Sequence, residues 1–413
     1  MKNKILLTIA DGLGDRPCTD LGGKTPLEYA TKPHLNYLAK NGTSGIMDVY
    51  QCGVPVGTDL GHMLLFGYNF EDYPGRGPIE AFGEGVELEG GDVAFRANFA
   101  TVDDRLTVLD RRAGRIRNRT KELAAALNGI TIDNVKIIFK EATEHRAVLV
   151  LRGKGLSAAV SDSDPKVEGK SYKKVLPKDS SPEAAKTADI LNCLLPRFHE
   201  ILAGNPVNVE RIKEGLPPAN FILTRGAGIM PNLEKITKKY GFTGACVAAE
   251  STVLGVAKLA GFTTITDARM TGNIDTDVQL KARLAIDALK KNDFVCLHMK
   301  CTDLMGHDNK PKGKAQGVEL YDKMLGYVLE YLQEINDANV IIAMAADHST
   351  PCERREHSGD PVPVVIAGKN IRKDDVEIYD EIHAAQGGLN RITGKMFNTF
   401  LLDYLEVIPK QGN

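Results

Sequence analysis

Four short apolar segments rich in branched side chains constrain the fold more than any other feature of the chain. They cover residues 5–10, 294–299, 340–346 and 362–367. Segments of this length and composition are typical of strands that are buried on both faces of a parallel sheet. Because ligands gather beyond the carboxyl ends of the strands in open α/β sheets, we expect the polar residues next to these segments to meet at one edge.

Each of the four segments adjoins residue types that bind metal ions. These are three aspartates and three histidines, namely Asp11, Asp303, His307, Asp347, His348 and His357. All of them follow a strand except His357, which precedes the segment 362–367. Such a set of oxygen and nitrogen ligands suffices for two divalent cations, and paired cations are typical of enzymes that transfer phosphoryl groups.

The spacing within the ligand segments adds local expectations. Asp303 and His307 are four residues apart, which places both on one face if a helical turn follows the strand. The neighbours Asp347 and His348 point in different directions, which suggests one ligand for each of two metals. An aspartate after a strand is more often a helix cap or a turn residue, and a single histidine is usually a surface or core residue. The coincidence of four such sites favours a metal centre.

Thr58 is the candidate nucleophile for phosphoryl transfer. It lies in the segment GVPVGTDLGHMLLFGY, in a turn before a helical run. There its hydroxyl would lie near the amide donors of a helix N-terminus, and coordination to a divalent cation would lower its pKa. The alternative is that Thr58 only caps the helix, and the two roles are compatible. His62, one turn later, is interpreted as a metal ligand, a substrate-facing residue or a buried side chain.

Side chains that suit an anionic substrate are concentrated between residues 110 and 225. The candidates for substrate binding are Arg111, Arg112, Arg115, His145, Arg146, Arg225 and Asp162. Guanidinium groups bind phosphate and carboxylate through paired hydrogen bonds. Arg117 and Arg119 are assigned to a solvated face instead. Asp162 and Asp164 are interpreted as general acid or base groups or as turn formers, and the turn is favoured.

From about residue 71 the sequence changes to glycine-rich turns and alternating apolar and polar segments, and this change predicts an α/β core that is interrupted by an inserted α+β domain. Residues 1–70 and 218–413 are assigned to the core, and residues 71–217 to the insertion. Because Asp11 is far in sequence from the other ligands, both core segments must contribute to one metal site. Helices are predicted at 25–42, 120–127, 182–202, 280–290, 317–338 and 389–405. Further strands are predicted at 45–50, 135–139, 147–151, 221–224, 245–249 and 263–266, with antiparallel sheet from about residue 71 onwards.

Length and composition exclude several classes of protein. A chain of 413 residues favours two domains. With 52 basic and 54 acidic residues, the net charge of −2 does not suggest a partner among nucleic acids or membrane surfaces. The N-terminal segment does not have the pattern of a signal peptide, and no apolar run is long enough to cross a bilayer. Seven cysteines without CxxC spacing fit a reducing cytoplasm, and Cys296 and Cys301 are interpreted as small buried apolar residues.

Several motifs resemble the archaeal-type cofactor-independent phosphoglycerate mutases of the alkaline phosphatase superfamily. They are LTIADGLGD, TPLEYATKPHLNYLAKNG, VGTDLGHMLLFGY, GRGPIEAFGEGV, TDLMGHD, AADHST and HSGDPVPVVI, and together they run nearly from end to end. The resemblance implies an alkaline-phosphatase-like core with a mainly parallel sheet flanked by helices, plus a smaller inserted domain. It also implies that Asp303, His307 and His357 hold one divalent metal ion. The other ion would be held by Asp11, Asp347 and His348, with Thr58 bridging towards it.

The same resemblance implies an isomerase that acts in glycolysis and gluconeogenesis. Thr58 would take the phosphoryl group of 3-phosphoglycerate and return it to the other hydroxyl, without 2,3-bisphosphoglycerate. Related mutases generally carry serine at this position. The arginines of the insertion would retain the glycerate, and closure of that domain would exclude water.

Other functions stay open at this point. A metal-dependent phosphatase or sulfatase would share the core, and a phosphopentomutase would share the chemistry. A metal-binding scaffold without activity is disfavoured because all six ligand positions are present. The ions are expected to be manganese, zinc, cobalt or magnesium, and the sequence leaves both the ion and homo-oligomer formation undecided.

Overall fold

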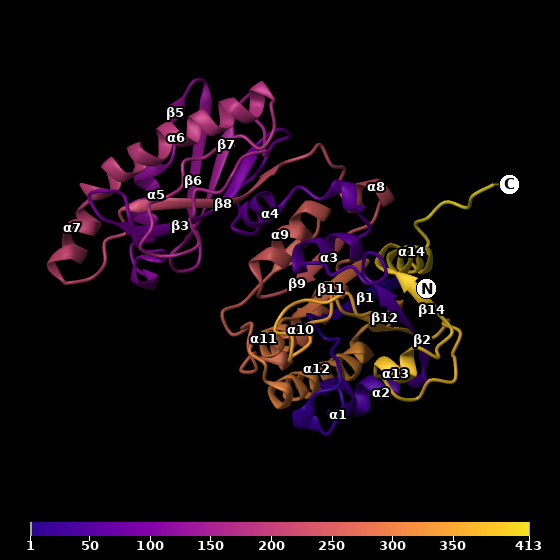
Figure 1. The fold of residues 1–413 in the computed structure, drawn as a ribbon. Helices are drawn as coiled ribbons and strands as arrows, with labels where there is room; N and C mark the ends of the chain where they lie inside the picture. The colour runs from indigo at the N-terminus through magenta and orange to yellow at the C-terminus, as the bar shows by residue number, and fades with distance from the viewer. Residues whose placement is uncertain (1, 413) are drawn as a thin grey trace. The chain divides into compact units, whose positions relative to one another are not determined.

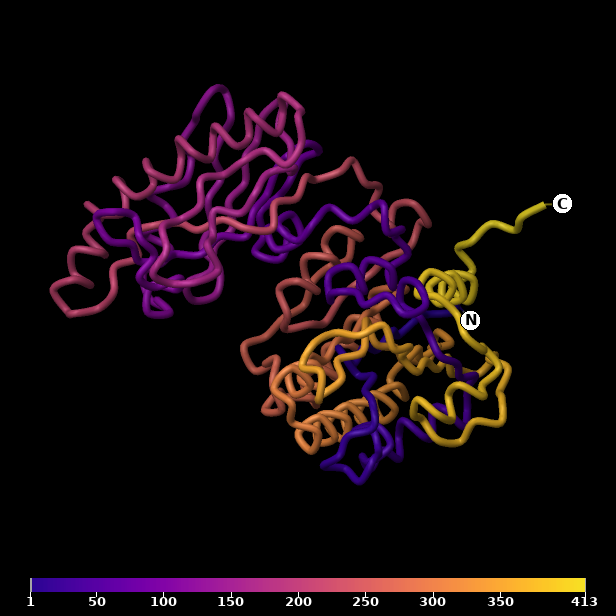
Figure 2. The backbone as a smooth tube through the Cα atoms, in the orientation of Figure 1, coloured from indigo at the N-terminus to yellow at the C-terminus, as the bar shows by residue number. Residues whose placement is uncertain are grey.

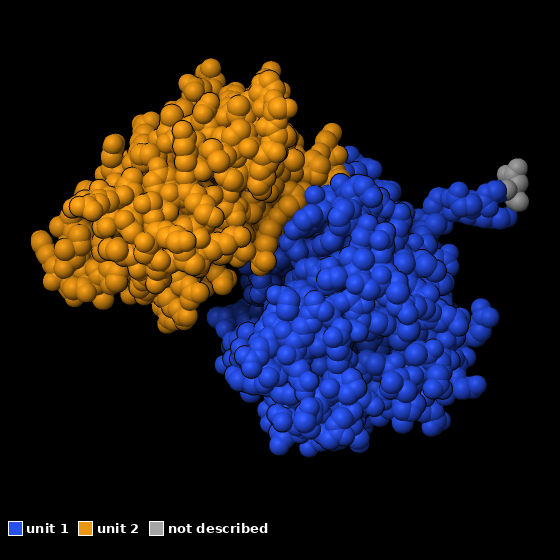
Figure 3. Space-filling view, in the orientation of Figure 1, with its two compact units in different colours: residues 1–73, 234–413 blue, residues 74–233 orange. Residues whose placement is uncertain are grey.

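The protein is described by a computed structural model over residues 2–412, which pack as two separate units (Figure 3). Unit 1 combines Met1–Tyr73 with Glu234–Asn413, and unit 2 is Pro74–Leu233. The predicted division differs at its C-terminal boundary, because residues 218–233 belong to unit 2. The reason is β8, Phe221–Ile229, which pairs antiparallel with β3, Val93–Val102, instead of joining the sheet of unit 1.

Unit 1 is built on an eight-stranded sheet in the order β10-β9-β11-β1-β12-β13-β2-β14. The strands are β1 (Lys2–Ala10), β2 (Gly42–Asp48), β9 (Gly244–Val247), β10 (Thr263–Ile265), β11 (Phe294–Met299), β12 (Ala338–Ala345), β13 (Val362–Ala367) and β14 (Asn390–Thr393). The sheet is mainly parallel, as predicted, and the apolar segments form its centre. The exception is β13, which runs antiparallel to both of its neighbours.

Helices cover both faces of this sheet (Figure 1). One face carries α2 (Pro33–Lys40), α10 (Val278–Leu289) and α12 (Pro311–Tyr331), and the other carries α3 (Thr58–Leu65), α9 (Ser251–Ala260) and α14 (Gly394–Tyr404). The shorter helices of the unit are α1 (Pro26–Tyr29), α8 (Ile236–Tyr240), α11 (Cys301–His307) and α13 (Glu381–Ala384). Figure 2 shows the first segment of the chain, in indigo, running among the orange and yellow segments. The two sequence segments of unit 1 therefore share one core.

Three predicted helices of unit 1 are wrong in extent. The helix expected at 317–338 is α12, which begins at Pro311 and ends at Tyr331, because proline suits the first turn of a helix and Ala338 already belongs to β12. The helix expected at 25–42 is divided into α1 and α2, because Pro33 has no amide hydrogen for a helix that would continue through it. Its predicted ends are correct, since Thr25 caps α1 in a capping box with Glu28 and Asn41 ends α2. The helix expected at 389–405 begins only at Gly394, because Asn390–Thr393 form the edge strand β14 beside β2.

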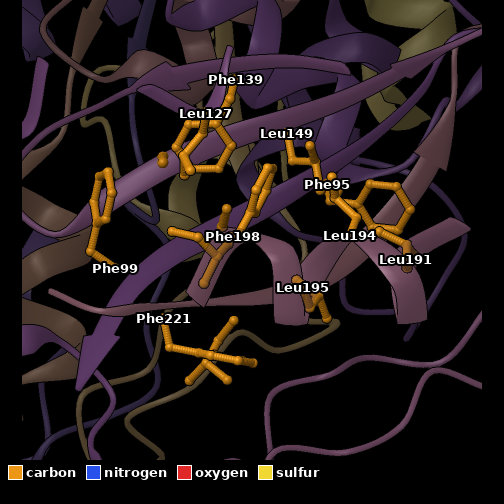
Figure 4. Packing of buried hydrophobic residues seen from close by; sticks show 14 of the residues in the cluster. Phe95, Phe99, Leu127, Phe139, Leu149, Leu191, Leu194, Leu195, Phe198 and Phe221 are labelled. Atoms are coloured by element: carbon orange, nitrogen blue, oxygen red, sulfur yellow. The ribbon is translucent and has the colours of Figure 1, made fainter. Parts of the chain in front are cut away.

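Unit 2 has a six-stranded antiparallel sheet with helices on both faces. Its strands are β3, β4 (Val108–Asp110), β5 (Thr131–Ile132), β6 (Val135–Glu141), β7 (Arg146–Arg152) and β8, and its helices are α4 (Arg76–Gly83), α5 (Thr120–Leu127), α6 (Pro182–Ala203) and α7 (Pro206–Lys213). Side chains of β3 and β7 alternate between the faces. Phe95 and Leu149 pack with α6 (Figure 4), whereas Ala94 and Val148 pack with α4. The segment 76–83 was expected in the sheet and is α4 instead.

Among the described residues, no helix is both long enough and apolar enough to span a bilayer.

Candidate metal centre

Three parallel strands and one reversed strand deliver the predicted ligands to one edge of the sheet of unit 1. Asp11 follows β1 directly, and its amide donates to the carbonyl of Met299 at the end of β11 at 2.9 Å. Asp347 follows β12, which pairs in register with β1. His357 precedes its strand, but β13 is antiparallel to β12, so the start of β13 lies at the same edge. This reversal explains how a residue before a strand joins residues that follow strands.

Asp303, His307 and His357 form one cluster of ligand atoms. The Nδ1 atom of His307 lies 2.9 Å from the carbonyl oxygen of Arg355, and that of His357 lies 2.8 Å from the carbonyl oxygen of Val56. Each Nδ1 therefore carries the hydrogen, and each Nε2 offers a lone pair. The two Nε2 atoms are 3.2 Å apart and lie 3.4 and 3.5 Å from Asp303 Oδ1. Lone pairs that face one another in this way are suited to a shared cation.

Asp11, Asp347 and His348 form the second cluster, and it includes Thr58. His348 Nδ1 lies 3.0 Å from the hydroxyl of Thr350, which leaves Nε2 as the acceptor. This Nε2 lies 3.4 Å from Asp11 Oδ1, 3.3 Å from Asp347 Oδ2 and 3.2 Å from Thr58 Oγ1. Ligand atoms of Asp347 and His348 lie together with Asp11, but His348 also groups with Asp303 and His357, so the expectation that Asp347 and His348 serve different metals stays a prediction. The clusters adjoin, since the rings of His348 and His357 stack at 3.6 Å.

The carboxylates of this centre are buried, so their negative charge calls for cations bound close to them. Asp11 and Asp347 are fully buried, and Asp303 is nearly so. Burial, followed by the negative charge of Asp347, raises the pKa of Asp11 well above its usual range. Within residues 2–412, Asp347 Oδ2 has no hydrogen-bond partner. Burial also lowers the pKa of His348 to about 4, which favours the neutral form that binds metal. These residues therefore fit two divalent ions.

Thr58 lies beside His348 in the second cluster and does not occupy the N-cap position of its helix. It is the first residue of α3, and Gly57 occupies the N-cap position. Its hydroxyl oxygen lies within the second cluster, as described above. His62, one turn later, is fully buried, and its Nδ1 lies 2.7 Å from the carbonyl oxygen of Thr58 and 3.3 Å from Asp347 Oδ2. His62 thus contacts the carboxylate of Asp347 and the backbone of Thr58.

Two residues of the centre were missed by the sequence analysis. Lys300 lies between β11 and α11, and its Nζ is 3.1 Å from Asp11 Oδ1 and 2.7 Å from Asp303 Oδ2. Burial opposes its charge, but these carboxylates raise its pKa above the usual range. His298, inside β11, lies with Nε2 2.9 Å from Asp11 Oδ2. The available signal was that both polar residues interrupt or end a strand that is otherwise buried and apolar.

Gly12 gives the two clusters room to approach β1. It has a φ of +62°, and a Cβ at this position would lie 2.5 Å from Thr350 Oγ1 and 2.7 Å from Asp303 Oδ1. A side chain would therefore displace the carboxylate of Asp303 as well as strain the backbone. The glycine in the ADG segment is required by both the conformation and the close packing.

Unit 2 contains a separate, strongly basic cavity of about 260 Å³. Its lining residues are Asn98, Arg111, Arg112, Arg115, Glu144, His145, Arg146 and Arg225. Burial, followed by the positive charges of Arg146 and Arg112, lowers the pKa of His145. In the described part of the chain, the buried Nε of Arg225 has no hydrogen-bond partner. Donors and positive charge in a concave site are suited to an anion.

The aspartates near this cavity have structural contacts. Asp164 is buried and binds Arg111 through two hydrogen bonds, of 2.9 and 2.6 Å. Asp162 accepts a hydrogen bond from the amide of Gly226 at 3.1 Å and is not among the residues that line the cavity. Arg117 and Arg119 are not among the lining residues. Arg117 pairs with the half-buried Glu144, which lines the cavity, and Arg119 pairs with the exposed Glu122 and Glu210. The cavity thus brings together the basic candidates but not Asp162.

Comparisons with known proteins agree with one another. Residues 39–208 match the family described as 2,3-bisphosphoglycerate-independent phosphoglycerate mutase. The chain is 46% identical over 404 residues to 2,3-bisphosphoglycerate-independent phosphoglycerate mutase 1 of Methanocaldococcus jannaschii, covering 97% of each chain. It is also 46% identical to the 2,3-bisphosphoglycerate-independent phosphoglycerate mutase of Methanococcus maripaludis, covering 99% of this chain and 100% of the relative.

Solved structures show the same similarity. A cofactor-independent phosphoglycerate mutase from Thermoplasma acidophilum superposes with a TM-score of 0.74 at 35% identity, covering 98% of this chain and 100% of that one. A protein from Pyrococcus horikoshii superposes with a TM-score of 0.84 at 38% identity, and both chains are covered completely. The similarity extends over both units.

Proposed function

The chain belongs to the 2,3-bisphosphoglycerate-independent phosphoglycerate mutases, and we propose that it interconverts 3-phosphoglycerate and 2-phosphoglycerate through a phosphothreonine at Thr58. One observation carries this proposal. Thr58 Oγ1 lies 3.2 Å from His348 Nε2, inside a cluster whose other members are buried carboxylates. A hydroxyl in that position is a nucleophile that a metal centre would activate.

The reaction we propose has two transfers that mirror each other. Thr58 Oγ1 attacks the phosphorus of 3-phosphoglycerate, the bond from phosphorus to the substrate oxygen breaks, and glycerate stays bound. Its other hydroxyl then attacks the phosphothreonine, which restores Thr58 and forms 2-phosphoglycerate. Divalent ions would lower the pKa of the Thr58 hydroxyl and stabilise charge on the phosphoryl oxygens. The ligands would be Asp303, His307 and His357 for one ion, and Asp11, Asp347 and His348 with Thr58 for the other.

The basic cavity of unit 2 is proposed to bind the anionic groups of the substrate. Support comes from the arginines that line it and from the buried donor of Arg225, which has no partner among residues 2–412. Arg111 is held by Asp164, so its remaining donors have a fixed direction. Retention of glycerate between the two transfers is what would distinguish a mutase from a phosphatase.

Two further features of the proposal follow from the ligand types and the cysteines. Mixed imidazole and carboxylate ligands suit manganese, zinc or cobalt, and magnesium is also compatible with the carboxylates. All seven cysteines are free thiols, and most of them are buried. Free thiols support a cytoplasmic location.

The proposal is tested by assaying the protein with manganese on 3-phosphoglycerate, without added 2,3-bisphosphoglycerate. Formation of 2-phosphoglycerate is coupled to enolase, and free phosphate is followed in parallel. We expect isomerisation that stops with EDTA and is lost in Thr58→Ala, while Thr58→Ser stays active. Phosphate release without isomerisation would mean a phosphatase, and neither product would mean a different substrate.

A further inference from the structure

Lys300 carries a positive charge and contacts both ligand clusters and the proposed nucleophile Thr58. Its Nζ lies 2.7 Å from Asp303 Oδ2, 3.1 Å from Asp11 Oδ1 and 3.4 Å from Thr58 Oγ1. The side chain is only 18% exposed. An ammonium group has three hydrogens, and here they serve one atom of each cluster and the reacting hydroxyl.

The two oxygens of Asp303 have separate partners. Oδ1 faces the Nε2 atoms of His307 and His357 and accepts the hydroxyl of Thr350 at 2.6 Å. Oδ2 faces Lys300. A cation bound to the histidines and to Oδ1 would therefore leave the contact between Lys300 and Oδ2 in place.

The other two contacts of Lys300 involve atoms that belong to the second cluster. Asp11 Oδ1 and Thr58 Oγ1 are both within 3.4 Å of His348 Nε2, so both would be ligands of an ion held there. With those atoms engaged, Lys300 would keep its anchor on Asp303 and have two hydrogens directed at the space around Thr58 Oγ1. That space is where the transferred group would be bound.

The charges of the metal centre indicate what the positive charge of Lys300 would contribute. Two divalent ions carry four positive charges, which equal the negative charges of Asp11, Asp303, Asp347 and an ionised Thr58 hydroxyl. The phosphoryl group of the substrate is an additional anion. Lys300 supplies the positive charge that faces it, and a fixed charge in a buried site needs little reorganisation during transfer.

We propose that Lys300 is a catalytic residue that binds the phosphoryl group in transit to and from Thr58. It is anchored by Asp303 Oδ2 and donates its remaining hydrogens to phosphoryl oxygens. This inference deepens the proposed function and rests on it. Its tests use inorganic phosphate and metal binding, so they do not depend on which phosphorylated substrate the enzyme isomerises.

The experiment compares Lys300→Met, which removes the charge at similar length, with Lys300→Arg, which keeps the charge. Lys291→Met is the matched control, because Lys291 is an exposed lysine of the same unit. Binding of Mn²⁺ alone is measured by electron paramagnetic resonance of the free ion. Binding of inorganic phosphate to the Mn²⁺-loaded protein is measured by the relaxation of its ³¹P signal, which reports only phosphate close to the bound ions.

For Lys300→Met we expect Mn²⁺ affinity that is equal to or tighter than in the parent protein, because a competing cation is removed. Phosphate affinity at the centre should fall by about 10- to 100-fold, the usual effect of losing a hydrogen bond between charged groups. Lys300→Arg should recover most of this loss, and Lys291→Met should behave like the parent.

Two results would overturn the inference. Unchanged phosphate binding in Lys300→Met would show that the ammonium does not contact the phosphoryl group. A loss of Mn²⁺ affinity that accounts for the weaker phosphate binding would instead make Lys300 a residue that only holds the carboxylates in place. If Lys300→Met does not fold, as judged by circular dichroism, Lys300→Gln is measured in the same two assays and decides between these outcomes.

Discussion

Replacing Gly12 with alanine should disable the metal centre through a contact that can be specified in advance. The new Cβ would lie 2.7 Å from Asp303 Oδ1 and 2.5 Å from Thr350 Oγ1. An ordinary contact begins at 3.4 Å, so Asp303 Oδ1 must retreat by 0.7 Å, the difference between 3.4 and 2.7. The same oxygen faces the Nε2 atoms of His307 and His357 at 3.4 and 3.5 Å. Its displacement spoils the geometry of that cluster.

The expected magnitude has two parts. Alanine at a φ of +62° costs about 1–2 kcal/mol of backbone strain. Overpacking against Asp303 and Thr350 adds about 1–3 kcal/mol. We therefore expect the free energy of unfolding to fall by about 2–5 kcal/mol, summed from these two contributions. We also expect Mn²⁺ affinity to fall by about 10- to 100-fold, as when the supporting contacts of metal ligands are lost.

Gly22→Ala is the matched control for this experiment. Gly22 has nearly the same conformation, with a φ of +67°, but a Cβ there would meet nothing within 4 Å. Urea unfolding gives the stability of both variants, and Mn²⁺ titration gives their affinity. The control should lose only the strain contribution and keep the affinity of the parent. If Gly12→Ala binds Mn²⁺ as tightly as Gly22→Ala, the argument from the Asp303 contact is refuted.

Three further outcomes are expected. Thr58→Ala should lower isomerisation in the enolase-coupled assay by at least about 10⁴-fold, because the nucleophile is lost, and residual activity near that of the parent would assign the nucleophile elsewhere. Arg225→Met should lower kcat/KM by about 10- to 100-fold because it removes a buried donor from the basic cavity, whereas the exposed control Arg119→Met should change it little. Burial raises the pKa of Glu381 from its ordinary 4.5 to about 7, so the folded protein retains a proton that the unfolded chain releases, and stability falls as the pH rises through this range. Glu381→Gln should remove that decline. Between pH 5 and pH 8, its free energy of unfolding in urea should rise relative to that of the parent protein by on the order of 1–3 kcal/mol. An identical pH dependence in both proteins would contradict the assignment.

The bounds of the interior strands of unit 1 could be predicted closely because a continuous apolar composition indicates a strand that is buried on both faces. The segments 294–299 and 362–367 match β11 and β13 at both ends. The direction of β13 could not be read in the same way, because a buried strand has the same composition whether it is parallel or antiparallel. His357 was nevertheless included among the candidate ligands because it adjoins the segment 362–367, although the rule about the carboxyl ends of strands does not cover a residue that precedes its strand.

Errors arose where pairing between distant segments decides the structure. Phe221–Ile229 has the apolar character of a core strand, but its partner is β3 in the other unit, and composition alone does not specify a partner. Lys300 was missed for a related reason. Lysine is usually exposed, and only the convergence of Asp11 and Asp303 from different strands makes its burial favourable.

The break at Pro33 was a different kind of error, because the signal was local and present. A proline in the middle of a predicted helix indicates an end or a kink at the preceding residue. The apolar periodicity on either side of Pro33 was given more weight than the missing amide hydrogen. Local rules of this kind could have placed α1 and α2 correctly from the sequence.

The division of unit 1 into two sequence segments has a consequence for the order of events during synthesis. Asp11 and Thr58 leave the ribosome early, whereas His357 follows Thr58 by 299 residues, the difference of their positions. At about 5–20 residues per second, that interval lasts roughly 15–60 s. Unit 2 is continuous in sequence and has its own apolar core, so it is complete before the ligands of the second segment exist. The proposed metal centre is thus among the last parts of the protein to mature, and a nascent chain carries Thr58, the proposed nucleophile, for most of its synthesis before the residues that would activate it are made.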